Sequence, residues 1–209
     1  MKDATDKLTP LGVMVLALLR EGDMHPYEMI RLLRHRRDDR MLTITNGTLY
    51  HTVARLERLG LLDEVGIDRE GNRPERTTYT LTDLGHDAVN EWVRRELPRT
   101  DRPAEFRIAL AESHNLPRDE VVDLLATRRT ALIGEDAVHR AGLEQARKRA
   151  VPEQFLIEVE RQAVLLEAEL RWIDDVIDRL ESPDLPWGAD ELPADHLPNY
   201  LAQRKAAQR

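Results

Sequence analysis

The 209-residue chain is acidic, with 31 basic against 39 acidic residues and a net charge of −8. This balance excludes a protein that coats nucleic acid through overall positive charge, and any DNA contact must come from local basic patches. The absence of cysteine excludes disulfides and thiolate chemistry. No apolar run is long enough to span a bilayer, and the first residues lack a signal core, so we expect a cytoplasmic protein.

Two helices are expected before residue 40. Thr9-Pro10 is typical of an N-cap followed by proline in the first helical position, and apolar residues recur at helical spacing to about Arg20. His25-Pro26 opens a second helix, which ends in an arginine-rich run. Its expected buried side is Tyr27, Ile30 and Leu33.

Residues 42–60 predict a third helix with two different sides. The apolar residues at helical spacing are Leu49, Val53, Leu56 and Leu59. Either Thr45 or Asn46 can cap the first turn, because a side-chain oxygen there accepts an unpaired backbone amide. Gly60 supplies the left-handed residue that ends the helix. A short helix with one apolar side and a polar start is the kind of element that enters a DNA major groove.

A hairpin and a fourth helix follow. Residues 61–67 and 76–81 read as strands joined by a turn at 70–72, and Thr82 caps a helix that runs to about Leu97. Three helices, a two-stranded hairpin and a further helix predict a winged helix-turn-helix, in which the hairpin flanks the reading helix. We therefore expect a mainly α protein with an N-terminal winged domain at 8–97.

The second half predicts helices alone. Residues 98–103 mark a boundary, and helices are expected over 104–114, 117–149 and 152–180. The last helix has an apolar seam of the coiled-coil type, which needs partner helices from its own chain or from another. We expect a coiled-coil-like dimerisation domain at 104–182 and a C-terminal extension at 183–209, with a short helix or loose chain at its end. The dimerisation residues expected are Phe155, Val159, Leu166, Leu170, Trp172, Ile173, Ile177 and Leu180.

Three segments together resemble the PadR family of bacterial transcriptional regulators. They are LTPLGVMVLALLREGDMHPYEMIRLL, TNGTLYHTVARLERLGLL and GNRPERTTYTLTDLG, which lie in the family's order within residues 8–97. The segment EAELRWIDDVIDRL is similar to the C-terminal domain of the longer-tailed branch. The resemblance implies a homodimeric winged-helix repressor that senses a small molecule. The wing departs from the family pattern, because Glu70 and Glu75 reduce its positive charge.

The third helix supplies most of the expected DNA contacts. Its geometry predicts that Thr48, His51 and Arg55 reach base edges or nearby phosphates, and that hydroxyls and amides at the helix start hold the phosphate backbone. Tyr50 lies on the flank, where it either meets a phosphate or packs as a core aromatic. The complete set of DNA-binding residues expected is Thr43, Thr45, Asn46, Thr48, Tyr50, His51, Arg55, Arg73 and Arg76.

Two interpretations are open for each group of basic residues outside this helix. Arg73 and Arg76 flank the hairpin tip, where they either contact phosphates and a minor groove or pair with the wing glutamates. Arg34, His35, Arg36, Arg37 and Arg40 either face phosphate or form a solvated helix end, because Asp38 and Asp39 interrupt the run.

Trp92 is the candidate for an effector site, because its helix links the two halves of the chain and an aromatic residue there could line a groove. The alternative is a core tryptophan between the domains. Trp172 lies beside the coiled-coil seam, and we expect it to pack at the dimer interface.

The sequence offers no enzyme signature. The seven histidines are scattered without metal-ligand spacing, and glycine loops for phosphate and nucleophile elbows are absent. We therefore expect no cofactor, no metal and no catalysis, with double-stranded DNA, a second copy and an unidentified small-molecule effector as partners. The alternative function is a winged-helix adaptor that binds protein and no DNA, which the acidic net charge favours.

Overall fold

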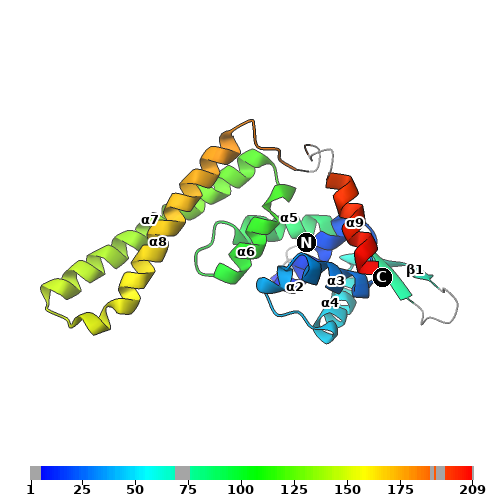
Figure 1. Ribbon diagram of the computed structural model, residues 1–209, viewed down its shortest axis with the longest axis horizontal. Coiled ribbons are helices and arrows are strands. Elements are labelled where there is room, and N and C mark those ends of the chain that lie inside the picture. The colour runs from blue at the N-terminus through cyan, green and yellow to red at the C-terminus, as the bar shows by residue number, and fades with distance from the viewer. Residues whose placement is uncertain (1–5, 69–75, 189–190, 192–195, 209) are drawn as a thin grey trace.

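The computed structural model describes residues 6–68, 76–188, 191 and 196–208. Figure 1 shows three parts: a winged domain, a long helical hairpin that projects from it, and a C-terminal helix that returns to the winged domain. The expected mainly helical fold with a two-stranded wing is confirmed.

The first three helices of the winged domain are α2 (Pro10–Arg20), α3 (Pro26–His35) and α4 (Asn46–Arg58), with the short η1 (Asp38–Arg40) after α3. The side chains of Thr9 and His25 accept hydrogen bonds from the first turns of α2 and α3, and a proline stands at the first position of each. Gly60, after α4, has φ +70, so the left-handed ending expected from the sequence is confirmed.

The wing consists of β1 (Leu62–Asp68) paired antiparallel with β2 (Arg76–Leu81). The register shifts between Glu64 and Gly66, and this bulge leaves Val65 half-exposed. The backbones of Met24 and Tyr79 exchange two hydrogen bonds of 3.1 Å, which attach the wing to the loop between α2 and α3. The expected turn at 70–72 lies outside the described residues.

Helix α5 (Asp83–Glu96) completes the winged domain and packs on α2. Thr82 caps it as expected, accepting from the amide of Gly85 at 3.0 Å and donating to the carbonyl of Gly60 at 2.8 Å. Gly85 lies so close to the start of the wing that an added Cβ would be 2.1 Å from the carbonyl oxygen of Leu61. Glycine at this position therefore sets how closely α5 approaches the wing.

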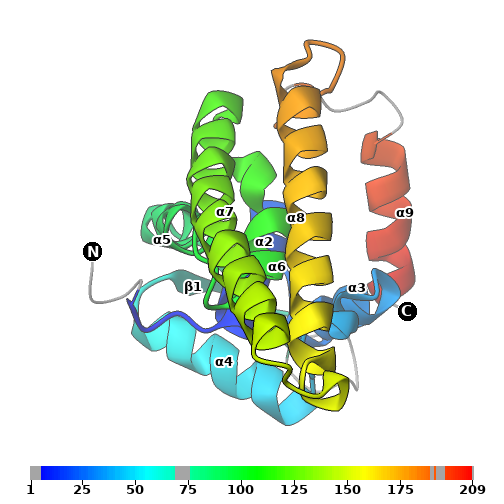
Figure 2. The ribbon, with the colours of Figure 1, turned by 90° about the vertical axis from the view of Figure 1, so that its left-hand side faces the viewer.

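Helix α6 (Pro103–Ala111) packs on α5 and α2, followed by η2 (Ser113–Asn115). The hairpin beyond it is α7 (Arg118–Lys148), η3 (Glu153–Phe155) and α8 (Ile157–Glu181). Figures 1 and 2 show α7 and α8 side by side along their length. The long last helix thus starts five residues later than the sequence analysis expected, after a short 3₁₀ turn.

The segment after α8 returns to the winged domain, where α9 (His196–Gln208) lies against α3 (Figure 2). Arg204 donates to the Glu28 carboxylate at 2.8 Å and to the carbonyl of Asp23 at 2.6 Å. Arg36 donates to the Gln203 side chain at 3.3 Å. The end of the chain is therefore a helix with specific contacts to the winged domain.

A buried cation joins the hairpin to the rest of the protein. The side chain of Arg128 on α7 is 3% exposed and pairs with Glu169 on α8 at 2.6 Å. Its guanidinium carbon lies 3.6 Å from the ring centre of Phe106 on α6, and it also donates to the carbonyl of Arg99. Phe106 in turn meets Trp172 edge-on. One side chain therefore connects α7, α8, α6 and the linker after α5.

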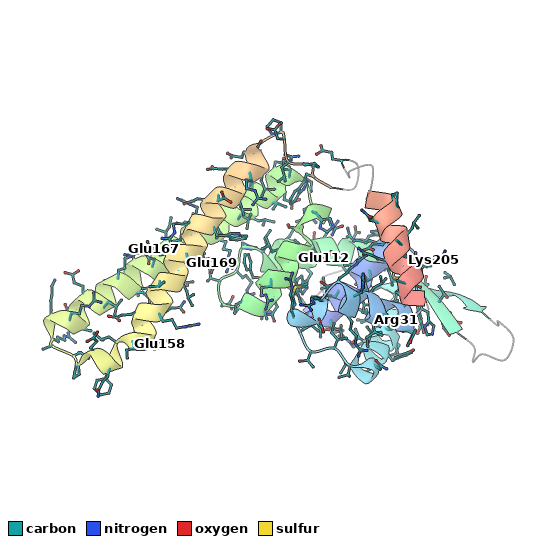
Figure 3. The ribbon with its side chains drawn as sticks, viewed as in Figure 1. Arg31, Glu112, Glu158, Glu167, Glu169 and Lys205 are labelled. Atoms are coloured by element: carbon teal, nitrogen blue, oxygen red, sulfur yellow. The ribbon has the colours of Figure 1, made fainter. Side chains whose placement is uncertain are left out.

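Glu112, at the end of α6, lies between the hairpin and the winged domain (Figure 3). Its carboxylate accepts from the side-chain amide nitrogen of Asn115 at 3.1 Å, and the side-chain oxygen Oδ1 of Asn115 accepts from Arg20 of α2 at 2.8 Å. Burial raises the pKa of Glu112 from 4.5 to about 7, although the positive charge of Arg20 opposes the shift. Glu21 and Asp38 are the nearby acidic groups that raise the pKa further.

We expect Glu112 to make the protein less stable as the pH rises from about 4.5 to 7. In this window the folded state retains a proton that the unfolded chain has released, so stability falls with rising pH. Glu112→Gln should remove this contribution, and the variant should gain stability relative to wild type at pH 8 but not at pH 4. Urea unfolding at the two pH values measures the difference. The exposed Glu158→Gln provides a matched removal of one carboxylate, and an equal effect of both variants would contradict the assignment.

Candidate nucleic-acid interface

Helix α4 is held in the winged domain by its apolar side, which consists of the buried Leu49, Val53 and Leu56, as the sequence analysis predicted. Thr45 is its N-cap. The hydroxyl of Thr45 accepts from the amide of Thr48 at 3.1 Å, and the hydroxyl of Thr48 accepts from the amide of Thr45 at 3.0 Å. This reciprocal capping box fixes the helix start, so both hydroxyls have a structural role in addition to any contact with phosphate.

The other side of α4 is exposed over its first two turns. Thr43, Asn46, Tyr50 and His51 are all exposed. Tyr50 is 45% exposed and meets His25 edge-on, so the alternative of a core aromatic does not hold. A polar helix start with an imidazole and a phenol beside it presents donors and acceptors that suit base edges and phosphates.

Arg55 was expected to reach into a DNA groove, but its side chain is bonded to residues of its own chain. Its guanidinium donates to the carbonyl of Lys7 at 2.5 Å and to the hydroxyl of Thr9 at 3.0 Å. These bonds hold the side chain at the start of α2. Arg58, near the end of α4, is exposed and donates to the carbonyl of Ala54 one turn earlier. A DNA contact by Arg55 would require that it leave its two partners at the start of α2.

A basic groove of about 410 Å³ lies between α3 and the start of α4. Arg31, Arg34 and His35 line it, and Arg34 donates to the Asn46 side chain at 3.5 Å. Tyr27 also lines it and is 42% exposed, so its expected burial is wrong. Arg31 lies over the Tyr27 ring, 5.6 Å from its centre, and this contact explains why an aromatic residue is stable at the surface.

Neither Tyr27 nor Arg31 is among the functional residues predicted from the sequence. The available signal was their spacing of four, which places them on one face of a helix. Of the wing arginines, Arg76 is the first residue of β2, and Arg73 lies outside the described residues.

Residues 15–91 match the transcriptional regulator PadR-like family. The chain carries a PadR-like domain. The match runs from Val15 of α2 into α5, and so includes α4 and the wing. PadR-like proteins are transcriptional regulators, and the winged-helix expectation agrees with this match.

Solved structures similar to the chain include PadR of Bacillus subtilis in complex with operator DNA, at 17% identity over 82% of this chain and 99% of that one, with a TM-score of 0.40. A transcriptional regulator from Clostridium thermocellum is 31% identical over 39% of this chain and 74% of its own, with a TM-score of 0.33. Bacillus subtilis PadR with p-coumaric acid is 16% identical over 83% and 100%, with a TM-score of 0.37. No curated protein matches the sequence.

Trp92 lies in the core of the winged domain rather than along a groove. It is 1% exposed and belongs to the same apolar cluster as Val89 and Val93 of α5. In this conformation no ligand can reach its ring, because packing on α2 and α6 covers that side of α5. The structure therefore agrees with the alternative interpretation, that Trp92 is a core residue. The prediction of an effector site at Trp92 is wrong.

The coiled-coil seam packs within the chain. Leu166, Ile173 and Leu180 are buried, and the partly buried Leu170 and Ile177 belong to the same cluster, because α7 covers this side of α8. Val159 is partly buried as well, whereas Phe155 is 65% exposed in η3. Trp172 packs on Phe106 of its own chain and is 37% exposed. A single chain thus satisfies most of the seam.

Within the described ranges, no group of three or more histidine, aspartate or glutamate side chains is arranged to hold a metal ion. Each helix in the same ranges is too short or too polar to span a bilayer.

Proposed function

We propose that this protein is a homodimeric, DNA-binding transcriptional repressor that reads its operator through α4 and the wing. The observation that supports this best is the exposed start of α4. The burial of its apolar side in the PadR-like domain leaves Tyr50 and His51 directed away from the core. The family match of residues 15–91 supports the same class of function.

The contacts divide into base and phosphate contacts. His51 is best placed to read a base edge, and the helix start at Asn46 to approach the backbone. The basic groove beside α4 adds Arg31 and Arg34 as phosphate contacts. These residues form a local basic patch. Because the net charge of the protein is −8, DNA contact requires such a patch.

The homodimer is supported by exposed apolar side chains on the hairpin. Phe155, Ile157 and Val164 are each more than 60% exposed, and Leu165 and Ile133 more than 40%. Exposed apolar side chains on α7, η3 and α8 favour association with a partner. We propose that the second copy covers these residues, while the seam of α8 remains inside each chain.

Dimer symmetry predicts a pseudo-palindromic operator with half-sites about one helical turn apart, or a multiple of it. Repression follows if the bound dimer blocks polymerase. A small-molecule effector releases the dimer from DNA by favouring a dimer geometry that no longer matches the half-sites.

We divide the chain into the winged domain at 8–97, the dimerisation domain at 104–182 and the extension at 183–209. We propose a cytoplasmic location and no catalytic activity.

Mobility-shift titration against the DNA upstream of the gene tests the proposal. We expect binding whose affinity falls steeply as salt rises, because phosphate contacts release counterions. His51→Ala should weaken binding about tenfold or more and relax sequence preference, since a good base contact contributes about 1–3 kcal/mol. Arg58→Ala, on the same helix but near its end, should change affinity little.

Equal losses for His51→Ala and Arg58→Ala would mean that α4 does not enter the groove start-first. Salt-independent binding, or none at all, would favour the adaptor function. Sedimentation of the free protein gives the oligomeric state, and a monomer at the concentrations that bind DNA would contradict the dimer.

A further inference from the structure

His25 fixes the start of α3 through its side chain. Its ring nitrogen Nδ1 accepts a hydrogen bond from the amide of Tyr27 at 3.0 Å, and its backbone has the extended conformation of an N-cap. The residues on both sides are anchored as well. Met24 exchanges two backbone hydrogen bonds with Tyr79 of the wing, and Pro26 is buried. The backbone that carries the imidazole is therefore held on both sides.

The bond to Tyr27 also determines which nitrogen of the ring carries the proton. Because Nδ1 accepts from the amide, it bears no hydrogen, and the proton of the neutral ring lies on Nε2. A ring bonded in this way cannot turn without losing the cap of α3. The imidazole of His25 therefore has one orientation in the folded protein.

The oriented imidazole meets Tyr50, which belongs to the exposed start of α4. The ring centres of His25 and Tyr50 are 6.3 Å apart, and the ring planes are inclined at 72°. This edge-to-face geometry is a favourable one for aromatic pairs. Tyr50 is nonetheless 45% exposed, so the contact holds its ring on one side and leaves much of the side chain in solvent. A phenol held in this way has lost rotamer freedom before any partner binds.

Two exposed tyrosines lie on the α3–α4 side of the winged domain, and each is held by a neighbour. Arg31 lies over Tyr27, 5.6 Å from its ring centre, and His25 meets Tyr50. Tyrosine is common at binding surfaces because its ring packs while its hydroxyl forms a hydrogen bond. His25 therefore contacts both tyrosines, Tyr27 through its amide and Tyr50 through its ring.

We propose that His25 is a positioning residue for DNA binding, whose imidazole holds Tyr50 in the orientation in which its hydroxyl donates to a DNA phosphate. His25 acts through Tyr50 and makes no DNA contact of its own. The part that concerns DNA rests on the proposed function, whereas the hold on Tyr50 in the free protein does not. A side chain that is ordered in advance loses less entropy on binding, which is equivalent to about a three- to tenfold gain in affinity.

Two substitutions separate the ring of His25 from its cap. His25→Asn keeps a good N-cap and removes the ring, whereas His25→Phe keeps a ring and removes the acceptor. In the mobility-shift assay we expect His25→Asn to weaken DNA binding about three- to tenfold and His25→Phe to bind within about twofold of wild type. Thermal unfolding should show the reverse order, with His25→Phe the less stable.

Two further variants complete this comparison. His86→Asn removes an exposed histidine of α5 and is the control, which should change neither affinity nor stability. His25→Ser, with an equally good cap, repeats the test should the asparagine variant fail to fold.

A double-mutant cycle tests whether His25 acts through Tyr50. In the Tyr50→Ala background, His25→Asn should cause no further loss of affinity, because the residue that it positions is gone. A loss that persists there would mean that His25 contacts DNA itself and would overturn the positioning role. Equal affinities of His25→Asn and wild type, or a larger loss for His25→Phe than for His25→Asn, would overturn it as well.

The hold on Tyr50 is tested without DNA by incorporating 3-fluorotyrosine into the full-length protein. The fluorine NMR signal of Tyr50 is assigned by its absence in Tyr50→Phe. In His25→Asn it should move toward the position of free 3-fluorotyrosine, and in His25→Phe it should not. An unchanged signal in His25→Asn would overturn the inference. If the signal moves as expected but the wild-type protein binds no DNA, the proposed function fails together with the DNA part, and the positioning of Tyr50 stands.

Discussion

Arg128→Met is expected to lower the free energy of unfolding by about 1.5–3 kcal/mol, the range for a hydrogen bond to a charged group, because Glu169, which is 31% exposed, loses its buried partner. The loss also includes the cation–π contact with Phe106 and the hydrogen bond to the carbonyl of Arg99. Because these four groups belong to different elements, the variant should also loosen the hairpin from α6. Urea unfolding followed by circular dichroism measures the stability change.

Arg129→Met is the matched control. Arg129 is the next residue on α7 and pairs with Asp174 of α8, but its side chain is 41% exposed. Surface pairs contribute at most about 1 kcal/mol, so this change should cost little. The double variant Arg128→Met/Glu169→Met should recover part of the loss, because the half-buried carboxylate is no longer left without a partner. A cost below 1 kcal/mol for Arg128→Met would show that the cation is not a structural link.

Gly85→Ala is expected to destabilise the winged domain by about 3 kcal/mol, at the upper end of the usual range for overpacking. The added methyl group would lie 2.1 Å from the carbonyl oxygen of Leu61 and 2.5 Å from a methyl carbon of Leu81. The first contact is with backbone, which cannot rotate away. Helix α5 must therefore shift away from the wing, which should also weaken DNA binding.

The same substitution at Gly134 gives the opposite expectation. Gly134 lies in the middle of α7 with nothing within 4 Å of an added Cβ, and alanine there should stabilise by about 0.5–1 kcal/mol. Thermal unfolding of the two variants separates local helix propensity from packing. A stabilised Gly85→Ala would mean that α5 does not approach the wing as closely as the structure shows.

Local signals predicted most of the winged domain. The apolar spacing of α4, its threonine cap and the left-handed Gly60 are each determined by residues within a few positions, and the structure confirms all three. The strand at 76–81 and the cap at Thr82 were predicted for the same reason. Such features depend on hydrogen bonds and side-chain periodicity that a sequence shows directly.

The remaining differences come from contacts between distant segments. Arg55 turns to Lys7 and Thr9, which precede it by more than forty residues, and helical periodicity alone placed it facing DNA. The apolar seam of α8 packs on α7 of the same chain. The sequence left open whether the partner helix comes from the same chain or from a second one. Trp92 has the spacing of a core residue and also of a groove residue, and only the packing of α2 and α6 decides between them.

The return of α9 to α3 limits how the hairpin can move. The winged domain is joined to the hairpin once through α6 and the linker before it, and a second time through the segment that ends in the Arg204–Glu28 pair. Any movement of α9 away from α3 would break the bonds of Arg204 and Gln203 and expose Ala207, which is buried in the apolar core. Tight docking of α9 therefore opposes a rearrangement that pulls this helix from the winged domain.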